Sequence, residues 1–198
     1  MATRREKEIE VMKELIISAA KEIIANEGFD NLSIRKIANK IEYSPSIIYH
    51  YFKDKEEIVN TVMRSGYMKI VNAVTISDSE NLTPTEKLRK MTKQYIEEAL
   101  KMSDEFLKAQ LNQSPQALKH TSYFYKGASR DKTALIALCN CLKDIYKDVD
   151  EEQIELKSQM IAASTMGLII KLIIEKDIEE EQRQKLINYF IEEVILKI

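Results

Sequence analysis

Apolar residues recur every three or four positions along most of this chain, which is the spacing of one face of an α-helix. A compact example lies between residues 33 and 52. Ser33 is a typical N-cap residue, and the apolar residues after it share one helical face: Ile34, Ile37, Ala38 and Ile41. Ser44 is a second N-cap residue, and Pro45 stands at the first helical position, which needs no N–H donor. The pattern predicts two short helices, one over about 34–40 and one beginning at 45.

Two short helices joined by a turn of three or four residues form a helix-turn-helix, whose second helix can enter the major groove of DNA. In this chain the buried side of the second helix would come from Ile48 and Phe52. Its other side is polar or small and consists of Ser44, Ser46, Tyr49, His50 and Lys53. This composition is typical of a helix that reads base edges.

The same spacing predicts longer helices on both sides of the motif. They span about 7–26, 53–76, 84–103, 104–113, 131–147, 151–175 and 180–197. Gly28 would end the first of them, and Asp131 would cap the fifth. Residues 116–130 are expected to be irregular or weakly helical. Arg4 and Arg5 would precede the first helix, either as a basic arm that contacts DNA or as a solvated terminus.

Composition agrees with an all-α protein. The 198 residues are 44% hydrophobic and 31% charged, with only four Gly and three Pro to interrupt helices. The net charge of −2 is not that of a protein whose whole surface binds nucleic acid. Residues 33–53 are the exception, because this segment contains one acidic residue, Glu42, and four basic residues: Arg35, Lys36, Lys40 and Lys53. One basic docking surface in an acidic chain is therefore expected.

Three short motifs occur in a fixed order around this segment. Gly28-Phe29 follows the first predicted helix, Ile37-Ala38 lies in the second, and Tyr49-His50-Tyr51-Phe52 lies in the third. In this order and spacing, residues 10–60 resemble the DNA-binding domain of the TetR (tetracycline-repressor-like) family of bacterial transcriptional regulators. The chain departs from the family at the turn, where Ile41-Glu42 replaces the common Ala-Gly. A left-handed Glu42 would cost about 1 kcal/mol relative to Gly.

The resemblance implies two domains, a DNA-binding domain over 1–54 and a helical effector-binding and dimerisation domain over 55–198. It also implies DNA contacts from residues near the second, third and fourth helices: Ser33, Arg35, Ser44, Pro45, Ser46, Tyr49, His50, Lys53 and Lys55. Tyr49, Lys53 and Lys55 suit phosphate oxygens, whereas His50, Ser46 and Arg35 are better candidates for base edges. No base sequence follows from these residues.

Family members hold a small molecule in the C-terminal domain. Candidates for the lining of such a pocket are the methionine and aromatic residues of that domain: Met91, Tyr95, Met102, Phe106, Tyr123, Phe124, Met160 and Met166. A thioether and aromatic lining would suit an apolar or aromatic effector with few polar groups. For each residue the alternative is ordinary core packing.

The last two predicted helices carry more apolar residues than one small body can cover. A two-fold dimer that pairs them into a four-helix bundle would bury the excess, and the resemblance implies the same. The expected interface residues are Leu168, Ile169, Leu172, Ile173, Leu186, Ile187, Phe190, Ile191 and Val194. The alternative is that these helices only close the core of the monomer.

Other classes of protein find less support. There is no Gly-rich phosphate loop, and the two histidines, His50 and His120, lack a catalytic motif, so an enzyme is not expected and no cofactor is implied. Cys139 and Cys141 are two positions apart on a predicted helix and point to different sides, which argues against a disulfide or a shared metal ion, although a minor metal or redox sensor stays open.

The sequence has no secretory signal pattern, and its longest apolar stretch is too short to span a bilayer. We therefore expect a cytoplasmic, homodimeric regulator of double-stranded operator DNA. Repression relieved by a small ligand is the expected mode, and ligand-dependent activation is the alternative.

Overall fold

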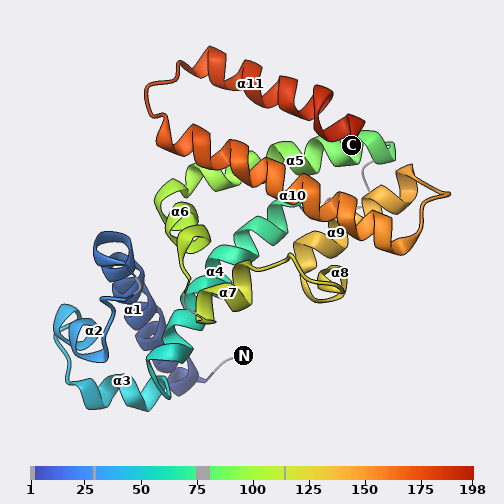
Figure 1. The fold of residues 1–198 in the computed structure, drawn as a ribbon. Helices are drawn as coiled ribbons and strands as arrows, with labels where there is room; N and C mark the ends of the chain where they lie inside the picture. The colour runs from blue at the N-terminus through green and yellow to red at the C-terminus, as the bar shows by residue number, and fades with distance from the viewer. Residues whose placement is uncertain (1–2, 29, 75–80, 114) are drawn as a thin grey trace. The chain divides into compact units, whose positions relative to one another are not determined.

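The computed structural model describes residues 3–28, 30–74, 81–113 and 115–198. These residues form helices and no strand, as the all-α prediction requires. In chain order the helices are α1 (Arg4–Glu27), α2 (Ile34–Lys40), α3 (Pro45–Tyr51), α4 (Lys55–Val74), α5 (Pro84–Lys101), α6 (Ser103–Leu111), α7 (Pro115–Thr121), α8 (Ala128–Asp131), α9 (Thr133–Ile145), α10 (Glu151–Ile174), α11 (Glu180–Glu193) and the 3-10 helix η1 (Ile195–Lys197) (Figure 1).

The described chain divides into two compact units. The first unit comprises residues 1–67 and 108–121, and the second comprises residues 68–107 and 122–198. The expected boundary at residue 54 lies inside the first unit, which also takes in much of α4 and all of α7.

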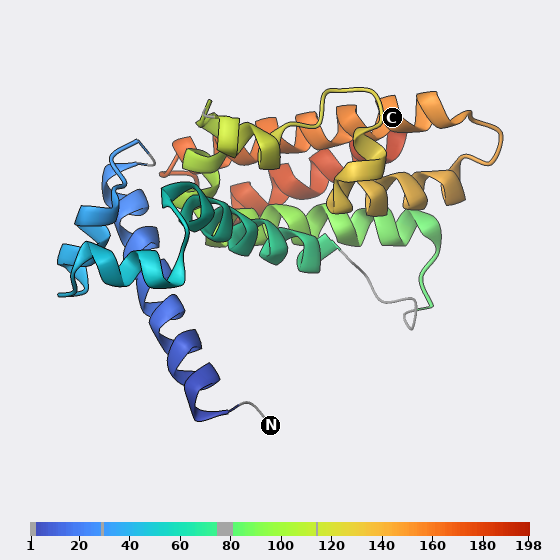
Figure 2. The same ribbon diagram turned by 90° about the horizontal axis from the view of Figure 1, so that it is seen from below.

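In the first unit, α2 and α3 pack on the C-terminal half of α1, while the N-terminal half of α1 extends away from them (Figure 2). The core of this unit is mainly aliphatic and includes Ile16, Ala20, Ile37 and Ile48, each with no exposed surface. Phe29 of the Gly28-Phe29 motif lies outside the described residues.

The start of α1 corrects one prediction. Arg4 and Arg5 do not form an arm before the helix, because they occupy its first turn. Thr3 and Glu6 make a reciprocal capping box, in which the Glu6 carboxylate accepts from the Thr3 N–H at 2.6 Å. This cap satisfies N–H groups that would otherwise lack partners and lengthens the helix by about one turn relative to the prediction.

The helix-turn-helix forms as predicted, with α2 at 34–40 and α3 beginning at Pro45. The Ser33 hydroxyl accepts from the Lys36 N–H at 3.2 Å and caps α2. Ser44 occupies the N-cap position of α3, but its hydroxyl lies 2.8 Å from the Ser46 hydroxyl and makes no cap hydrogen bond.

The turn between α2 and α3 contains a left-handed residue, Glu42, with φ 60°. A side chain at this conformation is strained, and glycine would relieve the strain. We expect Glu42→Gly to raise the free energy of unfolding by about 0.5–1 kcal/mol, measured by urea unfolding. Glu42→Gln is the matched control, because it removes the charge and keeps the Cβ. Equal stabilisation by both substitutions would contradict the strain argument.

A segment distant in sequence completes the first unit. Ala117 of α7 is fully buried in the same core as α1, α2 and α3. His120 Nε2 lies 3.2 Å from Asn60 Oδ1 of α4, and the Lys108 ammonium donates to the Ile24 carbonyl at 3.5 Å. Periodicity alone could not assign α7 to this core, because only tertiary contacts define its partners.

The second unit packs α5 against α9, α10 and α11, and α9 against α10. One core cluster gathers Leu88, Leu142 and Ile154, and another gathers Ile96, Ile169 and Ile187. Helices α10 and α11 run side by side in opposite directions (Figure 1).

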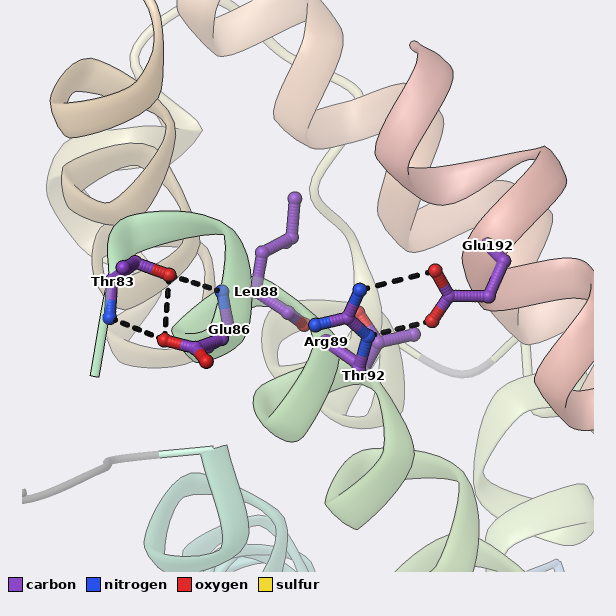
Figure 3. Close-up of polar contacts among 6 residues, drawn as sticks. All are labelled: Thr83, Glu86, Leu88, Arg89, Thr92 and Glu192. Atoms are coloured by element: carbon purple, nitrogen blue, oxygen red, sulfur yellow. Dashed lines mark hydrogen bonds and ion pairs between the residues drawn. The ribbon is translucent and has the colours of Figure 1, made fainter.

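Polar contacts cap the start of α5 and join this helix to the end of α11 (Figure 3). Thr83 and Glu86 cap α5 reciprocally, the Glu86 carboxylate accepting from the Thr83 N–H at 2.8 Å. Arg89 donates twice to Glu192 of α11, from Nε at 2.6 Å and from Nη2 at 3.1 Å. The hydrogen bonds from Arg89 hold the pKa of the Glu192 carboxyl below its usual value. The pair fixes α11 against α5.

Residues 116–130 are more ordered than expected, since they contain α7 and α8. The loop between these helices runs along α10 (Figure 2), where Gln159 donates to the Tyr123 and Tyr125 carbonyls at 2.8 and 3.1 Å. Glu155 accepts from the N–H groups of Gly127 and Ser129. Asp131 ends α8 and does not cap α9, whose N-cap position is Lys132.

Candidate DNA-binding surface and effector-binding unit

Helix α3 has one buried side and one exposed side. Ile48 and Phe52 are 0% and 4% exposed, whereas Tyr49 is 57% exposed and His50 is also exposed. Residues three and four apart lie on the same face of a helix, so burial of Ile48 and Phe52 turns Tyr49 and His50 outward. The His50 ring packs edge-on against the Tyr51 ring, with centroids 5.1 Å apart. This contact orients the imidazole without covering it.

Other expected DNA-contact residues also lie at the surface of the first unit. Ser44, Pro45, Ser46, Arg35 and Lys53 are exposed, and Ser33 and Lys55 are half-buried. Tyr43, 44% exposed in the turn before α3, was not among the predicted contacts. Its place beside the left-handed Glu42 could not be foreseen from periodicity, and exposure alone assigns it no role.

Ion pairs reduce the basic charge that the sequence suggested for this surface. Lys36 pairs with Glu27 of α1, and Lys40 pairs with Glu22 of α1 at 2.6 Å. These two lysines therefore tie α2 to α1. Arg35 and Lys53 make no ion pair among the described residues and supply the remaining charge.

The beginning of α4 is fixed by a second reciprocal arrangement. The Glu57 N–H donates to Asp54 Oδ1 at 2.9 Å, and the Glu57 carboxylate accepts from the Lys53 N–H at 2.6 Å. These bonds hold the backbone of Lys53 and leave its ammonium free to reach a phosphate. Asp54 thus caps the start of α4.

The residues predicted to line an effector pocket differ in their burial. Met91 and Phe106 are buried, and Tyr95, Met102 and Met166 pack against the two core clusters of the second unit. Phe124 and Met160 are 67% and 57% exposed, so they do not line an interior cavity. Met160 lies on α10, and an apolar helix gives no sequence signal for which of its faces is inside.

Tyr123 has a distinct environment among these residues. Its hydroxyl oxygen is buried and has no hydrogen-bond partner among the described residues, and burial raises the pKa of its phenol. The ring packs edge-on against Phe124 at a centroid distance of 4.9 Å.

The predicted dimer residues need a similar correction. Five of them are at most 7% exposed in the single chain and belong to its core: Ile169, Leu172, Ile173, Ile187 and Ile191. Side chains already covered within one chain have little surface left for a partner. Leu186 and Val194 are exposed, and Leu168 and Phe190 are half-buried.

Helix α10 nevertheless has an uncovered apolar face. Leu156, Met160 and Ile174 are each more than half exposed, and Gly167 lies on the same face. By length and composition α10 could also span a membrane, a test that the core helix of a soluble protein passes as well. Its opposite face packs in the core of the second unit, as expected for a core helix.

The cysteines are structural. Cys139 Sγ donates to Ser158 Oγ at 3.0 Å, and Cys141 Sγ donates to the Pro84 carbonyl at 3.2 Å. Burial raises the pKa of the Cys141 thiol to about 11 and raises that of Cys139, which keeps both thiols protonated at neutral pH. Within the described part of the chain no group of three or more His, Cys, Asp or Glu residues could hold a metal ion.

Comparison with known proteins identifies the first unit. Residues 16–62 match the family model described as bacterial regulatory proteins, tetR family, and this range holds the second half of α1 with α2, α3 and the start of α4. Within these residues the chain therefore carries a DNA-binding domain of the TetR type. The matched family is described as one of regulatory proteins, and the curated relative is also a regulator.

One curated relative is the fatty acid metabolism regulator protein of Bacillus subtilis (strain 168), 33% identical over 73 residues. That match covers 37% of this chain and 38% of the relative's length. It therefore spans well under two thirds of the relative.

Solved structures resemble this chain over nearly its whole length. FadR from Bacillus subtilis, in complex with stearoyl-CoA, has a TM-score of 0.70 at 18% identity, covering 91% of this chain and 98% of that one. The fatty acid degradation regulator FadR from Bacillus halodurans has a TM-score of 0.68 at 19% identity, covering 90% and 93%. At these identities the likeness establishes the fold.

Proposed function

We propose that this chain is a homodimeric repressor of the TetR type that binds a palindromic operator through α3 and is released by an apolar ligand. The observation that carries the proposal is the division of α3, with Ile48 and Phe52 in the core and Tyr49 and His50 exposed. A two-fold dimer presents two such helices to successive major grooves, which requires a palindromic or nearly palindromic operator. Such a regulator acts in the cytoplasm.

The apolar face of α10 supports the dimer. Leu156, Met160 and Ile174 on α10 and Leu186 and Tyr189 on α11 are exposed apolar residues on two antiparallel helices. Pairing two copies of these helices would remove this surface from water and form a four-helix bundle. This interface replaces the buried residues that the sequence had suggested.

The ligand class follows from the relatives and from the second unit. One relative regulates fatty acid metabolism, and a solved relative is in complex with stearoyl-CoA. The second unit of this chain offers a core of isoleucine, leucine, methionine and aromatic residues in which an acyl chain would find apolar contacts. We therefore assign the effector to fatty acyl compounds, with the acyl thioester as the first to be tested.

The experiment that tests the proposal is selection of duplexes from a random library by the purified chain at near-physiological salt. An enriched palindrome would support a dimeric sequence-reading regulator. Addition of stearoyl-CoA to the enriched duplex complex should then lower the bound fraction. Absence of enrichment, with the ligand-free and folded state of the protein verified, would refute the proposal.

Two substitutions separate phosphate contacts from base reading. Lys55→Ala should weaken binding to every duplex and lower the slope of log affinity against log salt by about one, because one phosphate contact is lost. His50→Ala should instead cost about tenfold on the selected operator and change the preference among sequences. Lys126→Ala, which removes an exposed lysine of the second unit, is the control. Uniform effects of His50→Ala across all duplexes would contradict its role in base reading.

A further inference from the structure

The N-terminal half of α1 is a helical segment without a buried side chain. The buried residues of α1 begin at Ile16, and the helix before it extends away from α2 and α3 (Figure 2). An isolated helix of about twelve residues is marginal in water. This segment carries its own stabilisation, namely the Thr3–Glu6 capping box and an ion pair between Arg4 and Glu8 at 2.9 Å. The chain therefore maintains a length of helix that the core of the first unit does not require.

The charges on this segment are divided between two faces of the helix. Arg5 shares a face with Met12, because seven residues complete two helical turns, and Met12 packs against the core of the first unit. Arg5 is exposed and makes no ion pair with another described residue. The opposite face carries Lys7, Glu10 and Glu14, which are all exposed. The face of Arg5 is thus positive, whereas the opposite face is net negative.

A contact between α1 and the end of α3 locates Arg5 relative to the proposed reading helix. The Lys13 ammonium lies over the Phe52 ring, 5.8 Å from the ring centroid, and Phe52 is the C-cap residue of α3. Arg5 precedes Lys13 by eight residues, which is about 12 Å along a helix axis. Figure 1 shows α3 and the first turn of α1 at the same lower edge of the first unit, and Figure 2 shows the start of α1 displaced to one side of α3. Arg5 therefore lies beyond α3 along the surface that would face DNA.

This displacement matches the dimensions of DNA. The major groove is about 12 Å wide and is bordered on each side by a phosphate backbone. With α3 in the groove, the first turn of α1 reaches the backbone at its border. The capping box already satisfies N–H groups of that turn, so a phosphate would meet the Arg5 side chain and not the helix end. A guanidinium group, always charged and with two parallel donors, suits phosphate oxygens.

We propose that Arg5 of each protomer binds a backbone phosphate outside the groove that α3 occupies. The first turn of α1 extends the DNA-binding surface as a rigid helix, which loses less conformational freedom on binding than a flexible arm would. Such a contact adds affinity and fixes register without reading sequence. The inference rests on the proposed function, because it names a further contact of the same regulator with DNA.

The first test is the salt dependence of binding to the selected operator and to an unrelated duplex, measured by fluorescence anisotropy. Arg5→Ala should weaken binding to both duplexes and lower the slope of log affinity against log salt by about one for each protomer bound. Arg5→Lys should keep the wild-type slope, since a lysine also neutralises a phosphate. Lys7→Ala is the matched control, because it removes one positive charge from the same turn on the opposite face. The control should leave the slope unchanged.

The second test locates the contact on the operator by ethylation interference, in which single phosphates are neutralised. For wild type, ethylation of a phosphate bordering the groove of each half-site should block binding. For Arg5→Ala, interference at that phosphate should disappear, while protection of guanine N7 in the major groove stays the same. Loss of N7 protection in Arg5→Ala would overturn the inference, because Arg5 would then act through the position of α3.

Two further results would contradict the inference. Equal losses from Arg5→Ala and Lys7→Ala would mean that both charges act only through the long-range field of the protein. An unchanged slope in Arg5→Ala, with the operator still bound, would refute the Arg5 contact and leave the repressor proposal standing. Selection of an operator by wild type is measured before any variant. If no duplex is enriched, the repressor proposal itself fails and the inference fails with it.

Discussion

Replacing Ile48 by Ala is expected to lower the free energy of unfolding of the first unit by about 3 kcal/mol. Ile48 has no exposed surface and lies in the core formed by α1, α2 and α3. Removing three carbon atoms there loses apolar burial and leaves a cavity that a small core cannot fully close. Because this core holds α3 in place, the same substitution should reduce operator affinity even though its side chain cannot touch DNA.

Hydrogen exchange of α2 and α3 amides, together with urea unfolding, measures the effect on the first unit. Ile47→Ala is the matched control, because Ile47 is the neighbouring residue of the same type and is only half-buried. The control should cost less than half as much. Equal losses at both positions would mean that α3 is not anchored through Ile48.

The helix-turn-helix was predictable because its signals are local. Ser33 caps α2 with its hydroxyl, Pro45 suits the first position of α3 because that position needs no N–H donor, and Gly28 ends α1 with φ 86°. The sequence also indicated the strain at Glu42, because the turn needs a conformation that side chains resist. These features depend on a few neighbouring residues.

Features that depend on distant partners were not predictable. Lys36 and Lys40 looked like DNA-binding charges, but they pair with Glu27 and Glu22 of α1. Such pairing needs the packing of α2 on α1, which no local pattern specifies. The basic charge of the candidate site was therefore overestimated.

Helix α10 shows the limit of periodicity most clearly. Its second half is apolar on several sides, so the sequence could indicate that two faces are covered but not which face meets which partner. Ile169 and Leu172 face the core of their own chain, whereas Met160 and Ile174 remain exposed.

Replacing both Met160 and Ile174 by Glu is expected to weaken dimerisation at least a hundredfold while leaving the monomer folded. The two side chains are 57% and 58% exposed and lie on one face of α10. In the single chain a carboxylate at either position stays in water and costs little. In a two-fold interface each substitution appears twice, and each buried carboxylate without a partner is unfavourable by several kcal/mol.

Sedimentation velocity over a range of concentrations measures this effect, with circular dichroism as the test of folding. Ile169→Ala is the contrasting variant, because Ile169 is fully buried in the chain's own core. It should lower the free energy of unfolding by about 2–5 kcal/mol and leave a folded fraction that still dimerises. A dimer that survives Met160→Glu with Ile174→Glu would place the interface elsewhere. A loss of operator affinity that parallels the loss of dimer would show that two copies of α3 must bind together.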